Sequence, residues 1–470
     1  MNKKWAIVRI ETKSREFLSK ALISYELAKS GYGVIITNKV GSDETIFPKG
    51  AYLINSLFSN GYSYVDTLKR YGQRILFLDE EGLVYINENR YVSRVDPKSL
   101  KIIDRVCCFG DDQARIIRKN FPEDASKVVV TGNPRMNLLN SYLRPLSFKD
   151  VQSIKQDYKK YILVVGNFSI ANLDNGGDTL EEKRNTVSKL FDAMKVKQGD
   201  EFNDQFDYVY ATMHKMMDLI VSLSKRFPDE TIIVRPHPSE DVRTWKKFAE
   251  KLPNVKVIRE GALNPWLLNA DLVLQNNCTS AIESMFMHVP CISYRPMTDE
   301  RFDQPLPNYL SKNVFTEEEA IFVVEKILSG SEVAFDFETY ETRSKEYIAN
   351  QQKDDSVRAI RECIDSLELQ PEEYSVQEYK RRARSLRRLP YRIKCTVKKI
   401  IKSCPDWILS PLPAKTKQKC IAIKQDNGMT KFGNIKAKDV EEVFDQIRKL
   451  KQDDIAFTIE QIGDEILIYQ

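Results

Sequence analysis

The stretch TIIVRPHPSED, from Thr231 to Asp241, begins as an apolar run of strand length and ends in a polar loop. Such a run, followed at once by Arg235 and His237, is typical of a buried parallel strand that ends beside a ligand. Pro236 and Pro238 restrict the loop backbone, so the imidazole is presented in one place. We predict that His237 and Arg235 contact an anionic ligand. The alternative is a histidine that caps or packs against the next helix.

Similar apolar runs occur on both sides of this stretch and alternate with segments of helical periodicity. The pattern predicts an α/β protein with two Rossmann-like doubly wound domains facing a cleft, the arrangement called GT-B. We expect the first domain over residues 1–150 and the second over 151–335, with a polar insertion near 172–207. Crossing helices are expected over 336–378, a basic amphipathic segment over 379–412 and a small α+β module over 413–470. Ligands of open α/β sheets bind outside the carboxyl ends of the strands.

Composition is that of an ordinary globular protein, with 42% hydrophobic and 30% charged residues. The net charge of +5 excludes a general polyanion binder, and we expect no nucleic-acid partner. The eight cysteines form no CxxC pair, so no zinc site is predicted and a reducing compartment is indicated. No apolar run has the roughly 18 residues of a membrane span. We expect a cytoplasmic protein.

Two further loops are predicted to bind phosphate. Asn277, Thr279 and Ser280 precede an amphipathic helix, whose first N–H groups form a ready anion site. Simple N-capping is the alternative, and it is compatible with ligand binding. Glu283, one turn into that helix, is a candidate ribose acceptor or an ordinary first-turn carboxylate.

The second loop predicted to bind phosphate follows the first strand of the second domain. Its backbone amides are expected to approach a phosphate, and the residues singled out are Gly166, Asn167 and Ser169. Neither a dehydrogenase GxGxxG nor a Walker loop is present here.

The RPHP stretch, about thirty residues before ADLVLQNNCTSAIESMFMHVPCISYRP, resembles the nucleotide-binding half of GT-B transferases that build bacterial surface polysaccharides. The similar families are the surface-carbohydrate biosynthesis proteins, the capsule Kdo transferases and the polysialyltransferases, over roughly residues 5–330. The resemblance implies that His237, Thr279 and Ser280 contact the phosphate of a CMP-sugar. CDP-glycerol-type polyol-phosphate transferases share a similar His and Ser pair, so the match points to a cytidine nucleotide more than to one transferred group.

Three acids, Asp79, Glu80 and Glu81, end a strand of the first domain in LFLDEEGLVY. Neighbouring carboxylates repel one another, so at least one should have a raised pKa if the site is buried. Sugar transfer needs a base or a nucleophile, and a carboxylate at the cleft suits either task. The run resembles the acidic element of the Kdo-transferase relatives. We favour Glu80 or Glu81, with Asp79 behind them; a solvated acidic turn is the alternative.

Acceptor contacts are expected from Gln113, Asn133 and Arg135. The resemblance places Gln113 in the cleft. Arg135 offers a planar fork for a carboxylate such as that of Kdo or a sialic-like sugar. Turn formation is the equal alternative for TGNPR. No acidic pair is clearly placed for a metal, so we predict no obligatory metal and no cofactor beyond the nucleotide-sugar substrate.

Between Lys380 and Lys402 the chain carries eleven Lys and Arg residues with no acid among them, interleaved with apolar residues. A solvated charged helix is one reading. We favour contact with an anionic inner-leaflet surface by residues 379–409, which suits an enzyme that extends a lipid-linked glycan.

The sequence thus predicts a metal-independent glycosyltransferase of surface polysaccharide assembly. Its donor would be a nucleotide sugar, best a CMP-activated Kdo or nonulosonic acid, and its acceptor a glycan or lipid-linked glycan. The alternatives are a CDP-glycerol or CDP-ribitol polyol-phosphate transferase, a UDP-sugar transferase, or a non-catalytic GT-B scaffold.

Overall fold

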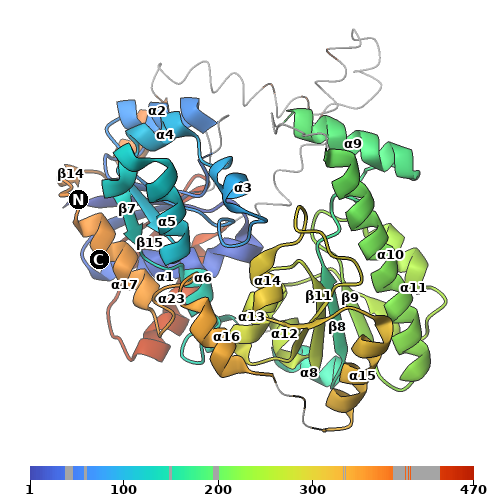
Figure 1. The fold of residues 1–470 in the computed structure, drawn as a ribbon. Coiled ribbons are helices and arrows are strands. Elements are labelled where there is room, and N and C mark those ends of the chain that lie inside the picture. The colour runs from blue at the N-terminus through green and yellow to red at the C-terminus, as the bar shows by residue number, and fades with distance from the viewer. Residues whose placement is uncertain are drawn as a thin grey trace.

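The computed structural model describes residues 1–37, 46–57, 61–147, 151–193, 201–331, 333, 335–384 and 435–470, with the single positions 397, 401, 403 and 416. Two α/β lobes lie side by side, each built around one sheet (Figure 1). The predicted pair of doubly wound, Rossmann-like domains in a GT-B arrangement is confirmed.

The sheet of the first domain has eight strands in the order β15-β16-β3-β2-β4-β5-β6-β7. Six of them are parallel, and their central residues are buried because helices cover both faces. They are β2 (Trp5–Arg9), β3 (Gly33–Thr37), β4 (Ala51–Ile54), β5 (Arg74–Leu78), β6 (Arg105–Cys108) and β7 (Val128–Val130).

Helices pack on both faces of this sheet. One face carries α1 (Lys13–Lys29), α6 (Pro134–Asn137), α7 (Arg144–Ser147), α17 (Asp355–Asp365) and α23 (Ala437–Lys451). The other carries α2 (Tyr62–Arg70), α3 (Glu88–Val92), α4 (Pro97–Ile102), α5 (Asp111–Asn120) and the 3₁₀ turn Pro122–Lys127.

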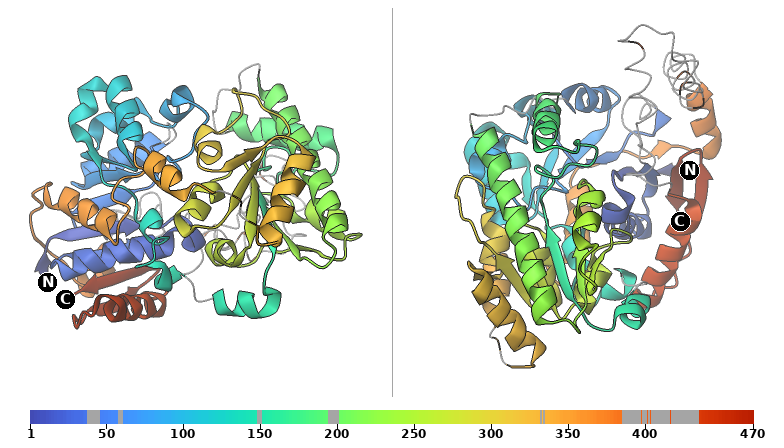
Figure 2. Two further views of the ribbon diagram at one scale, coloured as in Figure 1. Left: turned by 60° about the horizontal axis from the view of Figure 1, so that its bottom comes forward. Right: turned by 90° about the vertical axis from the view of Figure 1, so that its right-hand side faces the viewer.

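The C-terminal residues correct one prediction. Residues 413–470 were expected to form a small module, and the described part, 435–470, does contain a helix and two strands. These elements complete the first domain: β16 (Glu465–Tyr469) pairs antiparallel with β3, and β15 (Thr458–Ile462) pairs with β16. The helix α23 packs against α1, so the N- and C-terminal segments lie together (Figure 2). An otherwise open edge and apolar surface at β3 are thereby covered.

The sheet of the second domain has six parallel strands in the order β10-β9-β8-β11-β12-β13. They are β8 (Ile162–Gly166), β9 (Ile232–Arg235), β10 (Val255–Val257), β11 (Leu272–Asn276), β12 (Cys291–Tyr294) and β13 (Lys312–Val314). One face packs on α10 (Phe202–Arg226), α11 (Val242–Ala249) and α15 (Glu317–Leu328), and the other on α8 (Val151–Tyr158), α12 (Asn264–Asn269), α13 (Ser280–Met287) and α14 (Pro305–Tyr309).

The polar insertion after β8 is helical over part of its length. It contains α9 (Leu180–Ala193), and α10 begins at Phe202, before the expected end of the insertion at 207.

The chain then crosses back between the domains. The helix α16 (Phe337–Ser344) lies near α13 of the second domain, and α17 packs on α1 of the first. Between them, Ala349 donates a backbone hydrogen bond of 2.7 Å to Phe109. The short pair of β1 (Asn2–Lys3) and β14 (Glu372–Glu373) follows, and then α18 (Val376–Arg384).

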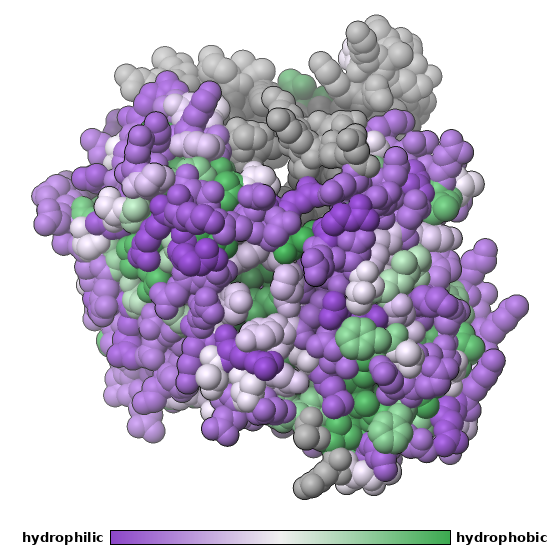
Figure 3. Space-filling model, in the orientation of Figure 1, coloured by the Kyte–Doolittle hydropathy of each residue, from purple (hydrophilic) through white to green (hydrophobic). Residues whose placement is uncertain are grey.

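Most of the predicted membrane-surface segment, 379–412, lies outside the described residues. At its start, Arg382 bonds Glu372 and Glu378 at 2.7 and 2.6 Å, so this base is paired within the fold. Among the described helices, none has the length and apolar character to cross a membrane. The face shown in Figure 3 is mostly hydrophilic, with apolar side chains visible in the hollow between the lobes.

Candidate functional site

The three acids of the first domain follow β5 directly and differ sharply in exposure. Asp79 and Glu80 are buried, whereas the Glu81 side chain is 52% exposed. A side chain at Gly82 would come within 2.3 Å of the Asp79 carboxylate, so only glycine permits this close turn. Of the three carboxylates, Glu81 is the one presented to solvent.

Asp79 has the raised pKa that the sequence predicted for one of the acids. Burial is the largest cause, and the Arg94 guanidinium acts in the opposite direction. Repulsion by Glu81 is a smaller contribution, so the acid is made weaker by loss of water more than by its neighbours.

Glu80 is instead held by a buried cation. Lys20 Nζ lies 2.8 Å from Glu80 Oε1, and both side chains are almost fully inaccessible. Burial by itself would raise the pKa of Glu80, but the charges of Lys20 and Arg135 outweigh it and hold that pKa below its ordinary value. Glu80 is therefore ionised and held in place by its ion pair with Lys20. Lys20 was not predicted, because a lysine on an amphipathic helix is normally exposed.

Glu81 is positioned by two arginines. Its Oε1 accepts a hydrogen bond of 2.7 Å from Arg15, and Arg94 lies 3.7 Å from its Oε2. These contacts fix the carboxylate at the mouth of the cleft while leaving it accessible.

Arg135 connects the two domains. It is the second residue of helix α6, donates a hydrogen bond of 2.8 Å to the Glu80 carbonyl, and places Nη2 3.8 Å from Glu283 Oε1 of the second domain. Burial raises the pKa of Glu283, and the Arg135 charge opposes this. A cavity of about 30 Å³ lies here, lined by residues of both domains: Glu80, Glu81, Leu83, Val84, Arg135, Met136, Thr279, Ile282 and Glu283.

His237 lies in the loop after β9, against the loop after the neighbouring strand β8. Its Nδ1 is 3.0 Å from Ser169 Oγ and 2.6 Å from Ser239 Oγ, and it accepts from the Ser239 backbone N–H at 3.2 Å. A backbone N–H can only donate, so Nδ1 must accept and the proton of the neutral ring lies on Nε2. The ring is thus fixed as a donor through Nε2.

Glu240 organises this loop, although it had no predicted role. The fully buried carboxylate accepts from the backbone N–H groups of Phe168 and His237 at 3.1 and 3.2 Å, and from Trp245 Nε1 at 2.8 Å. Burial raises its pKa. It therefore joins the β8 loop, the RPHP loop and α11. The only sequence signal was an acid inside a loop that also contains the predicted histidine.

Arg235 requires a correction. Its guanidinium donates to the carbonyls of Glu260 and Gly261 at 2.9 and 2.8 Å, and lies 5.1 Å from the centre of the Trp266 ring. Burial lowers its pKa to about 10. The side chain fastens the loop after β10 instead of facing a phosphate, because the strand alternation turns it into the domain.

The loop after β11 separates its predicted residues. Thr279 is exposed at the start of α13, and Ser280 is fully buried, so Thr279 is the hydroxyl presented to the cleft. Asn277 has a φ of +48° and accepts hydrogen bonds from Gln304 N and Asn308 Nδ2 at 3.0 and 3.2 Å. Its side chain therefore holds the segment before α14 and is not directed at a phosphate, which corrects that prediction.

In the β8 loop, a side chain at Gly166 would meet the Phe168 ring at 2.2 Å. Gly166 thus makes room for Phe168, whose N–H reaches Glu240. Asn167 is exposed, and its Oδ1 accepts from Ser169 Oγ at 3.2 Å.

Two predicted acceptor contacts are structural. Gln113 is buried; it accepts from Phe109 N at 2.6 Å and donates to Tyr91 at 2.7 Å, so it does not point into the cleft. Asn133 is fully buried and caps α6 through the Arg135 N–H at 2.9 Å. Both corrections have one cause: these amides satisfy backbone groups at the ends of strands.

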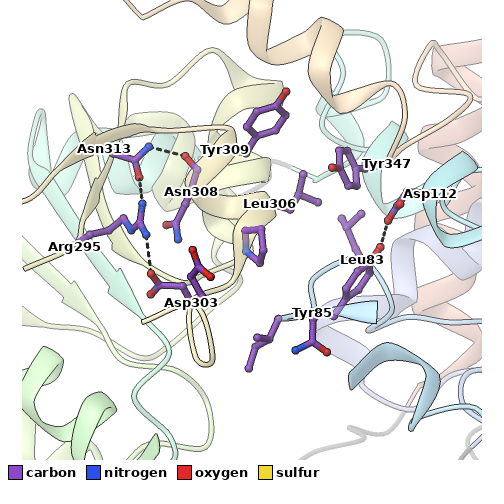
Figure 4. A pocket seen from close by; sticks show the side chains of 14 residues that line it. Leu83, Tyr85, Asp112, Arg295, Asp303, Leu306, Asn308, Tyr309, Asn313 and Tyr347 are labelled. Atoms are coloured by element: carbon purple, nitrogen blue, oxygen red, sulfur yellow. Dashed lines mark hydrogen bonds and ion pairs between the residues drawn. The ribbon is translucent and has the colours of Figure 1, made fainter. Parts of the chain in front are cut away.

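A larger cavity of about 730 Å³ lies beside this region, and Leu83 lines both. In Figure 4, Leu83, Tyr85 and Asp112 of the first domain lie opposite residues of the second, with Tyr347 of the crossing segment above. Arg295 is held by Asp303 at 2.6 Å, and Tyr208 donates to the same acid at 2.5 Å. Aromatic rings with a few fixed polar groups are typical of a small-molecule site. Its residues come from loops and from α5, α14 and β13, and their spacing in the sequence gave no motif.

No family model matches the sequence, and no curated protein matches it. Solved structures with a similar chain path include UDP-GlcNAc 2-epimerases from Methanocaldococcus jannaschii and Neisseria meningitidis. The first has 16% identity over 76% of this chain and 98% of the other, with a TM-score of 0.45. The second has 13% identity over 77% and 100%, with a TM-score of 0.48. The wall teichoic acid polymerase TagF, in a structure with CDPG, has 10% identity over 81% and 90%, with a TM-score of 0.48.

Proposed function

We propose that this chain is a GT-B glycosyltransferase that takes a sugar from a nucleotide donor, best a CMP-sugar, and adds it to a glycan of the bacterial surface. The observation that carries the proposal is the meeting of two chemically different sets of residues at one interdomain site. The first domain supplies the accessible carboxylate Glu81, and the second supplies Thr279 and the start of α13.

The second domain has the properties of a phosphate-binding half. Three adjacent strands, β9, β8 and β11, end in the loops that carry His237, Ser169 and Thr279. The Nε2–H of His237 and the first N–H groups of α13 suit the oxygens of a leaving nucleotide phosphate. Protein donors of this kind neutralise the phosphate, and the absence of an obligatory metal stays a prediction.

The first domain has the properties of the acceptor half. Glu81 is the accessible acid, and we assign to it the role of the base that takes the proton from the attacking acceptor hydroxyl. Glu80 and Lys20 act as a buried support below it, and Arg135 sets the spacing to the second domain. The resemblance of the RPHP and NNCTS stretches to capsule transferases supports a cytidine donor and a surface glycan.

Calorimetric titration with CMP, CDP, UDP and GDP tests the donor. We expect cytidine nucleotides to bind and His237→Ala to weaken them about tenfold or more, because a hydrogen bond to a charged group is lost. The exposed His214 provides the matched control, since His214→Ala should leave binding unchanged. Preference for CDP over CMP would favour a polyol-phosphate transferase. A lack of binding by every nucleotide would support the scaffold and reject the transferase.

We further propose that residues 379–409 bring the full chain to an anionic membrane surface. Vesicles with phosphatidylglycerol should co-sediment the protein, and neutral phosphatidylcholine vesicles should not. Reversing Arg387 and Arg388 to glutamate should weaken binding, since each base near such a surface contributes about 1 kcal/mol. Reversal of the exposed pair Lys246 and Lys247 on α11 is the control. Equal losses from both pairs would show that the attraction is not specific to this segment.

A further inference from the structure

Arg9, the last residue of β2, is buried at the carboxyl end of a central strand. Its side chain is 9% exposed. Strand alternation places it on the same sheet face as Trp5 and Ile7, which is the face covered by α2. It lies 5.7 Å from the centre of the Tyr64 ring, in the first turn of α2.

The described residues give this guanidinium few partners. Among the described residues, no acceptor receives a hydrogen bond from its Nε, and its ion pair is with Glu11 at 4.0 Å, the outer limit for such a contact. Arg235 is a useful comparison, because it is equally buried but donates to backbone carbonyls at 2.8 and 2.9 Å. A buried charge without close partners is costly, and so Arg9 needs an explanation.

The start of α2 adds to the positive character of this place. The N-cap is Gly61, which has no side chain to accept from the first N–H groups, and the first turn contains no acid. The guanidinium lies over the ring of Tyr64 in this first turn, so it and the positive end of the helix dipole belong to one part of the first domain, an arrangement that an anion would stabilise. Tyr62 and Ser63, at the helix tip, are exposed, so the tip is open to a ligand.

The position in the sheet also suits a ligand. The chain continues from β2 to β3 on one side and then to β4 on the other, so the strand order reverses beside β2. Open α/β sheets bind ligands in the crevice outside the carboxyl ends at this reversal.

We propose that Arg9 and the first turn of α2 bind an anionic group, a carboxylate or a phosphate, in the first domain. The assignment of this group to the acceptor glycan rests on the proposed function; the anion site itself does not. The planar guanidinium matches both chemistries through paired N–H donors.

Thermal unfolding of the full chain with increasing inorganic phosphate, at constant ionic strength, tests the site. In the absence of phosphate, Arg9→Met should raise the Tm, because it removes a buried charge that has no close partner among the described residues. Added phosphate should raise the Tm of the wild type and of His237→Ala, and should raise that of Arg9→Met by less than that of the wild type, because only the second-domain phosphate site is left in this variant. A lower Tm for Arg9→Met without phosphate, or equal phosphate stabilisation of this variant and the wild type, would overturn the proposal.

Arg9→Lys carries the test if Arg9→Met does not fold. This variant keeps the positive charge but loses the paired N–H donors of the guanidinium, so its half-saturating phosphate concentration should rise about tenfold. An unchanged half-saturation would contradict the site.

Two further measurements separate the sources and the proposals. Glucuronate and glucose 6-phosphate, against neutral glucose, distinguish a carboxylate from a phosphate ligand, and stabilisation by glucose alone would reject an anion site. Calorimetry with CMP should give the same affinity for Arg9→Met as for the wild type. Loss of CMP binding in Arg9→Met would move Arg9 to the donor site and overturn the assignment. If the wild type binds phosphate through Arg9 but no nucleotide, the proposed function fails and the anion site stands.

Discussion

Lys20→Met should lower the free energy of unfolding by about 3–5 kcal/mol, because it leaves the Glu80 carboxylate buried without its close partner. Arg135, at 4.0 Å, is too distant to replace a contact of 2.8 Å. Urea unfolding followed by circular dichroism at neutral pH measures the loss. The exposed Lys215 provides the matched control, and Lys215→Met should leave stability nearly unchanged. Equal stability of Lys20→Met and the wild type would show that the pair does not hold this end of the sheet.

The double variant Lys20→Met, Glu80→Met tests whether the loss comes from the unpaired Glu80 carboxylate or from the missing ion pair itself. Removing both charges should recover much of the loss, since a buried ion pair is often replaced by apolar groups at little cost.

The pH dependence of this stability has a definite sign. The pKa of Glu80 is lower in the folded chain than its ordinary value of 4.5, so its contribution is present above that value and is lost as the pH falls below it. The wild type should therefore lose more stability on acidification than the double variant.

Glu81→Gln should lower kcat by about 10²–10⁴-fold, because the acceptor hydroxyl would lose its base. Donor affinity should be unchanged, since Glu81 belongs to the first domain and the nucleotide is assigned to the second. The assay is the release of free nucleotide from the donor that the titrations identify, with and without acceptor. The exposed Glu123, also on the first domain, supplies the control variant Glu123→Gln.

Two outcomes would contradict this role for Glu81. Activity of Glu81→Gln within a few-fold of the wild type would exclude it as the base. If Glu283→Gln were then inactive while folded, the buried acid across the cavity would be the better candidate, since burial raises its pKa. Loss of nucleotide binding in Glu81→Gln would instead place this carboxylate at the donor.

The cavity of about 730 Å³ adds a site of small-molecule size next to these groups. Its walls come from both domains and from Tyr347, so its shape depends on how the domains meet. Arg135 lies between Glu80 of the first domain and Glu283 of the second, and its contacts with both help to hold the two domains at their observed separation.

The sequence by itself determined the two parallel sheets, because continuous apolar strands separated by amphipathic helices have few other ways to bury their surface. It also placed Glu81, His237 and Thr279 at strand ends, since the carboxyl edge follows from the order of strand and loop. Local patterns were sufficient for these features.

Tertiary structure alone decided which polar residues face the cleft. Arg235, Gln113 and Asn277 have the residue types of a ligand site, yet they satisfy carbonyl or amide groups of neighbouring loops. Lys20 and Glu240 have the residue types of a surface, yet they are buried under the site. The pairing of β16 with β3 could not be predicted from the sequence either, because the two strands lie more than four hundred residues apart in the chain. Burial and pairing between distant segments determine these roles, and neither is encoded in the spacing of nearby residues.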